Sequence, residues 1–225
     1  MAPVKVGQVP PGRGPMFHKL SPKLVQVTLW PAPQAEPWPK VLKFRFGKAF
    51  PATHPTSRLC LELLQEVLAA APVSNLLDVG CGAGVLSLAA AALGVPRVVA
   101  LDISGHAARE TRENARENDL AGPLLVARGS AECVKAAFDL VMANLFWEVQ
   151  LDKATELSRL AAPAGALILS GFRDYRENLL KERYQSLGWS LSHRVSKDFR
   201  HPDLPPDLSF TWVAWVLKRN ETSAK

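Results

Sequence analysis

The sequence predicts an α/β fold, with a mostly parallel, doubly wound sheet of seven strands between layers of helices. Apolar strand-like runs alternate with helix-like segments over most of the chain, which is typical of a parallel sheet covered on both faces. One strand leads into a glycine-rich turn, Gly80 to Gly84, that opens a helix. The last two apolar runs have no helix between them, so they should form an antiparallel hairpin that closes the sheet.

Length, charge and cysteine content fit one cytoplasmic domain of this kind. The 225 residues are about what one α/β domain with a small appendage needs, and 48% of them are hydrophobic. Three cysteines without C-x-x-C spacing predict neither a disulfide framework nor a metal site. The net charge of +6 favours an acidic or ribonucleoprotein partner, with ordinary surface charge as the alternative. Neither a membrane span, nor a secretory signal, nor a dedicated nucleic-acid surface is expected.

Prolines dominate residues 1–45, which we expect to form an N-terminal arm. Nine prolines occur in the first 40 residues, and each removes a backbone donor and fixes φ. One short strand is expected over residues 24–30, and the rest should lie extended on the surface or be partly disordered. Trp30 and Trp38 would then pin the arm to the main domain.

The main domain is expected over residues 46–220, followed by a tail at 221–225. Its first helix, with Thr53 as the cap, is indicated by apolar residues at helical spacing: Leu59, Cys60, Leu63, Leu64, Val67 and Leu68. Strands are predicted at residues 75–79, 97–101, 124–127, 138–143, 166–170, 189–195 and 210–217, the last two joined by a proline-rich loop at 201–208. Helices are predicted at residues 83–93, 104–118 (capped by Ser104), about 148–160 and 175–187.

The strongest local signal is the strand that ends at Val79 and enters a G-x-G-x-G turn. Glycines are needed where a backbone turns tightly and approaches a ligand closely, and the helix that follows presents free N–H groups. The spacing differs from the G-x-G-x-x-G of dinucleotide sites, and Asp78 precedes the first glycine by two residues. A carboxylate there would repel a pyrophosphate, whereas it suits the ammonium of a methionine moiety, directly or through water.

The turn therefore favours S-adenosylmethionine as the cofactor over NAD or FAD. Contacts are expected from the carboxylate and from the turn itself: Asp78, Gly80, Cys81, Gly82 and Gly84. The alternative for Asp78 is a structural partner of the helix dipole. Asp102, with Ile103 beside it, ends the second strand, where a carboxylate can bind the ribose hydroxyls; the alternative is an N-cap.

Two later strand ends add further candidates at the same edge of the sheet. Ser130 follows the third strand, where an adenine could be held, with a plain turn serine as the alternative. Asn144 follows the fourth strand and would place its amide beside the transferred methyl group. Its carbonyl can accept from an attacking amine and orient the lone pair. Phe146 and Trp147 are expected to form an apolar wall, with core packing as the alternative.

The expected acceptor chemistry needs an amine that is neutral. Burial near Phe146 and Trp147 would lower the pKa of an acceptor lysine. Glu148 and His54 are candidates for a base because both should lie near the carboxyl edge of the sheet. No dedicated base is otherwise evident. The catalytic candidates are therefore Asn144, Phe146 and Trp147.

One block before the glycine turn is more distinctive than the turn. The relevant segments are Ala49-Phe50, His54-Pro55-Thr56-Ser57, Leu59-Cys60-Leu61, Asp78 to Gly84, Ala143-Asn144-Leu145 and Leu169-Ser170-Gly171. With these segments the chain, from about Gly47 to Lys218, resembles the PrmA-type ribosomal protein methyltransferases. The resemblance implies a class I, Rossmann-like methyltransferase fold and S-adenosylmethionine-dependent methylation of a large-subunit ribosomal protein. It also implies that Thr56 and Ser57 approach the cofactor, with His54 as either a neighbour or a plain helix-start residue.

The chain departs from the family pattern in two places. Phe50 is followed by Pro51-Ala52-Thr53, where the family usually has Phe-Gly-Thr-Gly-x before the histidine, so the loop over the methyl group should differ in shape. Family members also carry an N-terminal recognition domain, and the proline-rich segment here is too short and broken for a comparable one.

Protein methylation on lysine or an N-terminal amine is therefore the first hypothesis. The alternatives are a small-molecule methyltransferase, a non-catalytic cofactor-binding module and, last, a dehydrogenase. The Asn-Pro-Pro-Tyr motif of release-factor glutamine methyltransferases is absent at residues 144–147.

Overall fold

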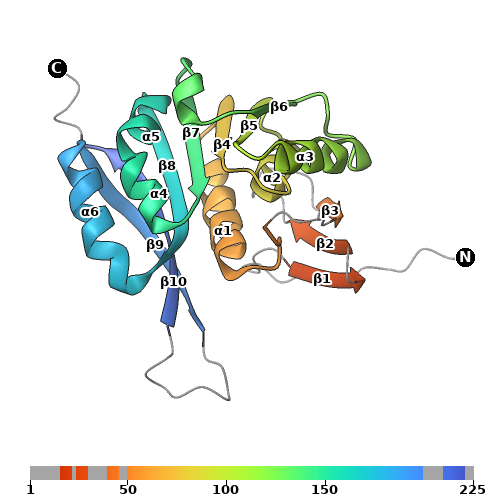
Figure 1. Cartoon of the computed structure of the whole chain (residues 1–225), viewed down its shortest axis with the longest axis horizontal. Coiled ribbons are helices and arrows are strands. Elements are labelled where there is room, and N and C mark those ends of the chain that lie inside the picture. Colours follow the sequence, from red (N-terminus) through yellow and green to blue (C-terminus); the bar gives the residue numbers. More distant parts are fainter. Residues whose placement is uncertain (1–15, 22–23, 30–39, 46–49, 200–209, 221–225) are drawn as a thin grey trace, which may run out of the picture.

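A computed structural model describes residues 16–21, 24–29, 40–45, 50–199 and 210–220 (Figure 1). Its centre is a seven-stranded sheet in the order β6-β5-β4-β7-β8-β10-β9. The strands are β4 (Asn75–Val79), β5 (Arg97–Asp102), β6 (Leu124–Arg128), β7 (Phe138–Asn144), β8 (Ala161–Arg173), β9 (Trp189–Phe199) and β10 (Phe210–Arg219). Strands β4 to β8 pair in parallel, and β10 pairs antiparallel with both β8 and β9. The predicted fold class is confirmed.

Helices cover both faces of this sheet, because successive strand residues point to opposite sides. On one side, Leu76 and Leu140 pack with α1 (Pro55–Ala70) and α2 (Val85–Ala92), beside α3 (Gly105–Glu117). On the other side, Leu77 and Val141 pack with α5 (Ala154–Leu160) and α6 (Glu177–Ser186). Two 3-10 turns, η1 (Ala131–Cys133) and η2 (Asp174–Arg176), complete the connections. Among the described helices, none has the length and apolar character to cross a bilayer.

The helix expected over residues 148–160 is instead two helices, α4 (Trp147–Asp152) and α5. They meet at Lys153, whose φ of −92° and ψ of 6° leave the helical region. The hydrogen bonds continue through the bend, because Lys153 N–H donates to Val149 (2.9 Å) and its carbonyl accepts from Leu157 (2.8 Å). The chain can therefore change direction here without leaving backbone groups unpaired.

The N-terminal region contains more structure than the single predicted strand. An antiparallel sheet is formed by β1 (Met16–Ser21), β2 (Leu24–Leu29) and β3 (Lys40–Arg45), in that order. Alternate residues of β2 and β3 are buried in the same core cluster as α1 and α2: Val25, Val27, Leu29, Leu42 and Phe44. Figure 1 shows this small sheet beside α1 and α3.

The prolines of this region do not interrupt its strands, because all of them fall outside the three strand segments. The stretches between them keep the alternation of a strand with one buried face. The expectation of an arm is therefore wrong for the described residues. Trp30 and Trp38, proposed as contacts of the arm, lie outside the described residues, as does the loop at 201–208. The domain boundary near residue 45 stays a prediction.

Candidate active site

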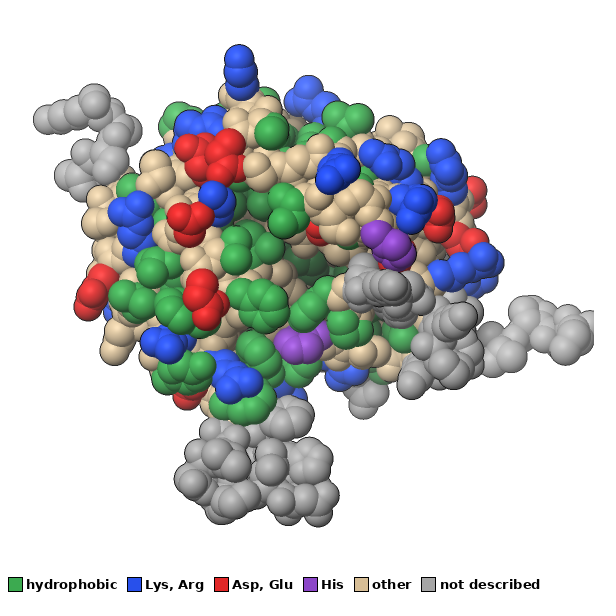
Figure 2. All heavy atoms as spheres, viewed as in Figure 1, with side chains coloured by type: hydrophobic (Ala, Val, Ile, Leu, Met, Phe, Trp, Pro, Cys, Tyr) green, Lys and Arg blue, Asp and Glu red, His purple; other side chains and the backbone are tan. Residues whose placement is uncertain are grey.

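A cavity of about 780 Å³ lies at the carboxyl edge of the parallel strands. This volume is typical of a site for a small molecule or cofactor. The cavity brings together many of the residues predicted from the sequence: Thr56, Gly80, Gly82, Asp102, Ile103, Ser130, Asn144 and Phe146. Figure 2 shows a hollow at the centre of this face, surrounded largely by hydrophobic side chains.

The glycine turn forms the floor of the cavity between β4 and α2. Gly80 N–H donates to the Leu101 carbonyl at 2.8 Å, which ties the turn to β5. Gly80, Gly82 and Gly84 have φ values of 77°, 57° and 83°, a region that side chains strongly disfavour. A Cβ on Gly80 would also lie 2.3 Å from Leu145 Cδ2. The expected need for glycine is therefore confirmed at this turn.

Two members of the turn serve the scaffold and do not line the cavity. Gly84 is the N-cap of α2, and a Cβ there would lie 2.7 Å from both Leu88 and Thr111. The Cys81 thiol is buried and lies 3.4 Å from the Thr111 hydroxyl, and burial raises its pKa. Their predicted role as cofactor contacts receives no support from this placement.

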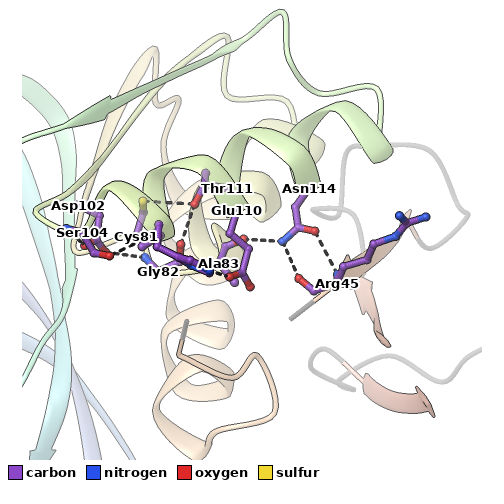
Figure 3. Close-up of polar contacts among 11 residues, drawn as sticks. Arg45, Cys81, Gly82, Ala83, Asp102, Ser104, Glu110, Thr111 and Asn114 are labelled. Carbon is purple, nitrogen blue, oxygen red and sulfur yellow. Dashed lines mark hydrogen bonds and ion pairs between the residues drawn. The ribbon is translucent and has the colours of Figure 1, made fainter. Parts of the chain in front are cut away.

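Asp102 is held at the cavity edge by backbone donors. One carboxylate oxygen accepts from Gly82 N–H (3.0 Å) and the other accepts from Ser104 N–H (2.8 Å), as Figure 3 shows. Each carboxylate oxygen can accept a second hydrogen bond, so the group retains capacity for two hydroxyls. The alternative of an N-cap is wrong: Ser104 caps α3, with its side chain accepting from Ala107 N–H.

Asp78 lies beneath the turn, only 1% exposed, and it does not line the cavity. Its carboxylate accepts from both the N–H (3.1 Å) and the hydroxyl of Ser87, in the first turn of α2. Burial raises its pKa from 3.8 to about 6, against the lowering effect of the Ser87 hydrogen bonds. This geometry favours the alternative role, a partner of the helix start, over direct contact with an ammonium.

Asn144 ends β7 at the cavity, and its side-chain oxygen Oδ1 is buried without a hydrogen-bond partner among the described residues. The following segment is fixed to β8: Leu145 N–H donates to the Ser170 carbonyl at 3.0 Å. Gln150 is fully buried and donates from Nε2 to the Leu145 carbonyl at 2.7 Å. An unsatisfied buried acceptor is costly, so Asn144 carries an unused acceptor at the point where β7 reaches the cavity.

His54 is the N-cap of α1, where Thr53 was predicted. Thr56 N–H donates to His54 Nδ1 at 3.3 Å, and the Thr56 hydroxyl lies 2.8 Å from the same nitrogen. A backbone N–H can only donate, so Nδ1 is the acceptor and the neutral ring carries its proton on Nε2. Partial burial lowers the pKa of His54, which favours this neutral form. Ser57 does not line the cavity, and its hydroxyl donates to the Pro51 carbonyl at 3.5 Å.

Comparison with known proteins decides the family. The model of a family described as ribosomal protein L11 methyltransferase (PrmA) matches residues 17–198. The chain belongs to this family. A ribosomal protein L11 methyltransferase of Pelobacter propionicus is 36% identical over 203 residues, covering 88% of this chain and 61% of that protein. One of Thermotoga maritima is 33% identical over 181 residues, covering 80% of this chain and 63% of that protein. The chain therefore spans about 60% of the length of these relatives.

Solved structures agree with the PrmA assignment. The ribosomal protein L11 methylase of Lactobacillus delbrueckii subsp. bulgaricus superposes with a TM-score of 0.64 at 26% identity. The match covers 79% of this chain and 84% of that chain. A tRNA m1G37 methyltransferase of M. jannaschii gives a TM-score of 0.62 at 13% identity over 93% of this chain and 58% of that one, which shows the fold alone.

In this PrmA-family chain, the two predicted aromatic residues lie in different surroundings. Phe146 lines the cavity and is 71% exposed, so it can contact an acceptor. Trp147 begins α4, packs against the core and lies under the Arg176 guanidinium, 4.2 Å from its ring centroid. It does not line the cavity, so its predicted part in the wall receives no support from this placement. Glu148 is exposed and also lies outside the cavity, so this placement gives no support to its role as a base.

Several cavity residues were missed because they come from distant parts of the PrmA-type chain. Phe50 and Trp212 line the cavity on either side of His54, with ring centroids 4.6 Å and 4.9 Å from it. Lys153 also lines it and forms ion pairs with Glu132 and Asp152, both at 2.8 Å. Trp212 lies in β10 without any local motif; Phe50 carried a signal only through the family resemblance.

Proposed function

We propose that this chain binds S-adenosylmethionine in the cavity and transfers its methyl group to an amino group of a protein. The first candidate acceptor is a ribosomal protein, because the relatives are named for that activity. The observation that carries the proposal is Asn144, which lines the cavity with Gly80 and Gly82 and whose Oδ1 has no hydrogen-bond partner within the described part of the chain.

The residues at the cavity fit this cofactor. Asp102 retains acceptor capacity for the two ribose hydroxyls, and Gly80 and Gly82 leave room for close approach of a ligand to the backbone. Ser130, at the end of β6, lines the region expected for the adenine, although its hydroxyl donates to Glu132. The bound cofactor would supply a methyl group already activated on a sulfonium.

The other side of the cavity fits an amine acceptor. Asn144 Oδ1 can accept one N–H of the amine and thereby direct its lone pair. Phe50, Phe146 and Trp212 give apolar walls, which disfavour a charged ammonium and lower the pKa of a buried amine. The protein thus acts mainly by positioning its reactants and removing water from them.

His54 does not serve as the base in this arrangement. Its Nδ1 lone pair is engaged by Thr56, and its Nε2 carries the proton in the neutral ring. The ring therefore offers a hydrogen-bond donor to the cavity. The acceptor amine must lose its proton to water or arrive neutral, so methyl transfer should increase with pH until the bound amine is fully deprotonated.

The test is transfer of radiolabelled methyl groups into a cell extract that lacks this enzyme, followed by protease or ribonuclease treatment. We expect label in a protease-sensitive ribosomal band and loss of at least ~100-fold with Asn144→Ala, since a group that orients a reactant contributes several kcal/mol. Asn178→Ala, exposed on α6 outside the cavity, is the matched control. Label confined to small molecules would overturn the protein acceptor, and label resistant to protease but lost with ribonuclease would indicate RNA instead.

A further inference from the structure

A fully enclosed asparagine on α3 joins two parts of the molecule that are far apart in sequence. Asn114 is 1% exposed, and its Oδ1 accepts from Arg45 N–H in β3 at 3.1 Å. Its Nδ2 donates to the Arg45 carbonyl at 3.3 Å and to the Ala83 carbonyl at 3.0 Å. Ala83 belongs to the glycine turn, so one amide bridges the small sheet and the turn (Figure 3).

The same face of α3 also forms a hydrogen bond with a second carbonyl group of the turn. The Thr111 hydroxyl donates to the Gly82 carbonyl at 2.9 Å, one helical turn before Asn114. On the opposite side, Gly82 N–H donates to Asp102. Hydrogen bonds from α3 thus fix the peptide groups at Gly82 and Ala83. The orientation of these peptide groups determines the positions of the turn and of the Asp102 carboxylate at the cavity.

Arg45 fixes the direction of the Asn114 amide. An amide group can rotate so that its oxygen and nitrogen exchange places, and only one orientation donates to Ala83. The donor Arg45 N–H and the acceptor Arg45 carbonyl select that orientation, since each would face a like group after rotation. The position of the Arg45 backbone therefore determines whether the turn keeps its hydrogen bond from Asn114.

We propose that Asn114 is a positioning residue that couples the N-terminal sheet to the cofactor turn, so that cofactor affinity depends on the hydrogen bonds between Asn114 and Arg45 of β3. The proposal rests on the proposed binding of S-adenosylmethionine in the cavity. It assigns the three-stranded sheet a part in forming the cofactor site, although none of its described residues lines the cavity.

The chain supplies a matched control four residues later. Asn118 contacts β3 in the same manner: its Oδ1 accepts from Lys43 N–H at 2.9 Å and its Nδ2 donates to the Lys43 carbonyl at 2.8 Å. It also donates to the backbone carbonyl of Asn114 at 2.8 Å, and no hydrogen bond joins it to the turn among the described residues. Replacing Asn118 weakens the attachment of β3 without removing the donor to Ala83.

The first experiment measures S-adenosylmethionine binding by calorimetry for wild type, Asn114→Ala, Asn114→Asp and Asn118→Ala. We expect a Kd raised about tenfold or more in both Asn114 variants and less than threefold in Asn118→Ala, with all variants compared at temperatures well below their unfolding midpoints. Equal effects at positions 114 and 118 would overturn the proposal and indicate general loosening of the sheet. Failure of the wild-type protein to bind would instead refute the proposed function.

The second measurement needs no variant. Because coupling is reciprocal, saturating cofactor should slow hydrogen exchange at the Arg45 amide, whose partner is Asn114, by about the same factor of ten. The Lys43 amide, bonded to Asn118, should change by less than threefold, and residue-resolved NMR would distinguish the two. Equal slowing at both amides, or none at Arg45 in a protein shown to bind the cofactor, would contradict the coupling.

Discussion

The two sides of the cavity are built in different ways. On the side that we propose for the cofactor, the glycine turn forms backbone and side-chain hydrogen bonds with β5 and α3, through Leu101, Asp102 and Thr111. On the side that we propose for the acceptor, Asn144, Phe146 and Trp212 come from strand ends and loops brought together by packing. The cofactor side is therefore specified by short sequence motifs, whereas the acceptor side depends on tertiary contacts that can change without altering the motif.

The largest expected effect lies on the acceptor side, at Gly171. Its φ is 99°, and a Cβ would lie 2.1 Å from the Leu145 carbonyl oxygen, a backbone atom next to Asn144. Gly171→Ala should therefore cost about 3 kcal/mol or more in denaturant unfolding, from backbone strain and overpacking, and should abolish methyl transfer.

Gly94 gives the matched control for that prediction. It has the same φ of 99°, and no atom lies within 4 Å of the point that a Cβ would occupy. Gly94→Ala should cost only about 1 kcal/mol, the strain of the backbone conformation alone. Similar costs at the two positions would show that close packing of β8 on Leu145 does not define the acceptor side.

The next effect tests whether Asp78 is part of the scaffold. Burial raises its pKa from 3.8 to about 6, so the folded protein binds this proton more tightly than the unfolded chain. The stability that this group contributes is complete below about pH 4 and is lost as pH rises through 6. Two pKa units correspond to about 3 kcal/mol.

Asp78→Asn removes this ionisation while keeping an acceptor for Ser87. Relative to the variant, wild type should lose up to about 3 kcal/mol of unfolding free energy between pH 4 and pH 7, measured by denaturant titration. A difference that does not vary with pH would rule out a shifted carboxyl group. A large loss of cofactor affinity at unchanged stability would restore the ligand role first predicted for Asp78.

Asp102 tests the cofactor side directly. Asp102→Ala should raise the Kd for S-adenosylmethionine about 30- to 100-fold, because hydrogen bonds to a charged group contribute about 2–3 kcal/mol. Asp139 is the control, since its carboxylate also accepts two backbone N–H groups, those of Ser74 (2.8 Å) and Asn75 (3.2 Å), outside the cavity. Asp139→Ala should lower stability and leave the Kd unchanged; calorimetry showing equal affinity for both variants would remove Asp102 from the site.

The residues that the cavity gathers on the side proposed for the cofactor have local signals in the sequence. The glycine turn, Asp102 and the Ser104 cap follow from residue types at strand ends and helix starts, and the structure places them together. The role of Asp78 is harder to predict from the sequence, because strand spacing does not show which neighbour a carboxylate faces. Its hydrogen-bond partner Ser87 lies on α2. Trp212 had no local signal, since its position depends on the pairing of β10 with β8.

The prediction for the N-terminal region failed for a related reason. A high proline content disfavours strands, yet each proline constrains only its own position and its immediate neighbours. The alternation in Val25, Val27 and Leu29 was the better signal, because burial of one face decides whether a short strand forms. The contact between this small sheet and the glycine turn through Asn114 cannot be predicted from local sequence, because 69 residues separate Asn114 from Arg45.

The smallest expected effect is on the Kd for the cofactor, and it comes from removing a single hydroxyl, that of Thr111. Thr111 donates to the Gly82 carbonyl and is completely buried, so Thr111→Val should leave that carbonyl without its partner at nearly constant shape. We expect a cost of about 1 kcal/mol, seen as a roughly fivefold higher Kd for the cofactor. Thr111→Ser keeps the hydroxyl and should bind within about twofold of wild type, whereas the kcat of methyl transfer at saturating cofactor should be similar in all three proteins. A fall in kcat with Thr111→Val would mean that the glycine turn also positions the acceptor, and the two sides of the cavity would then not be independent.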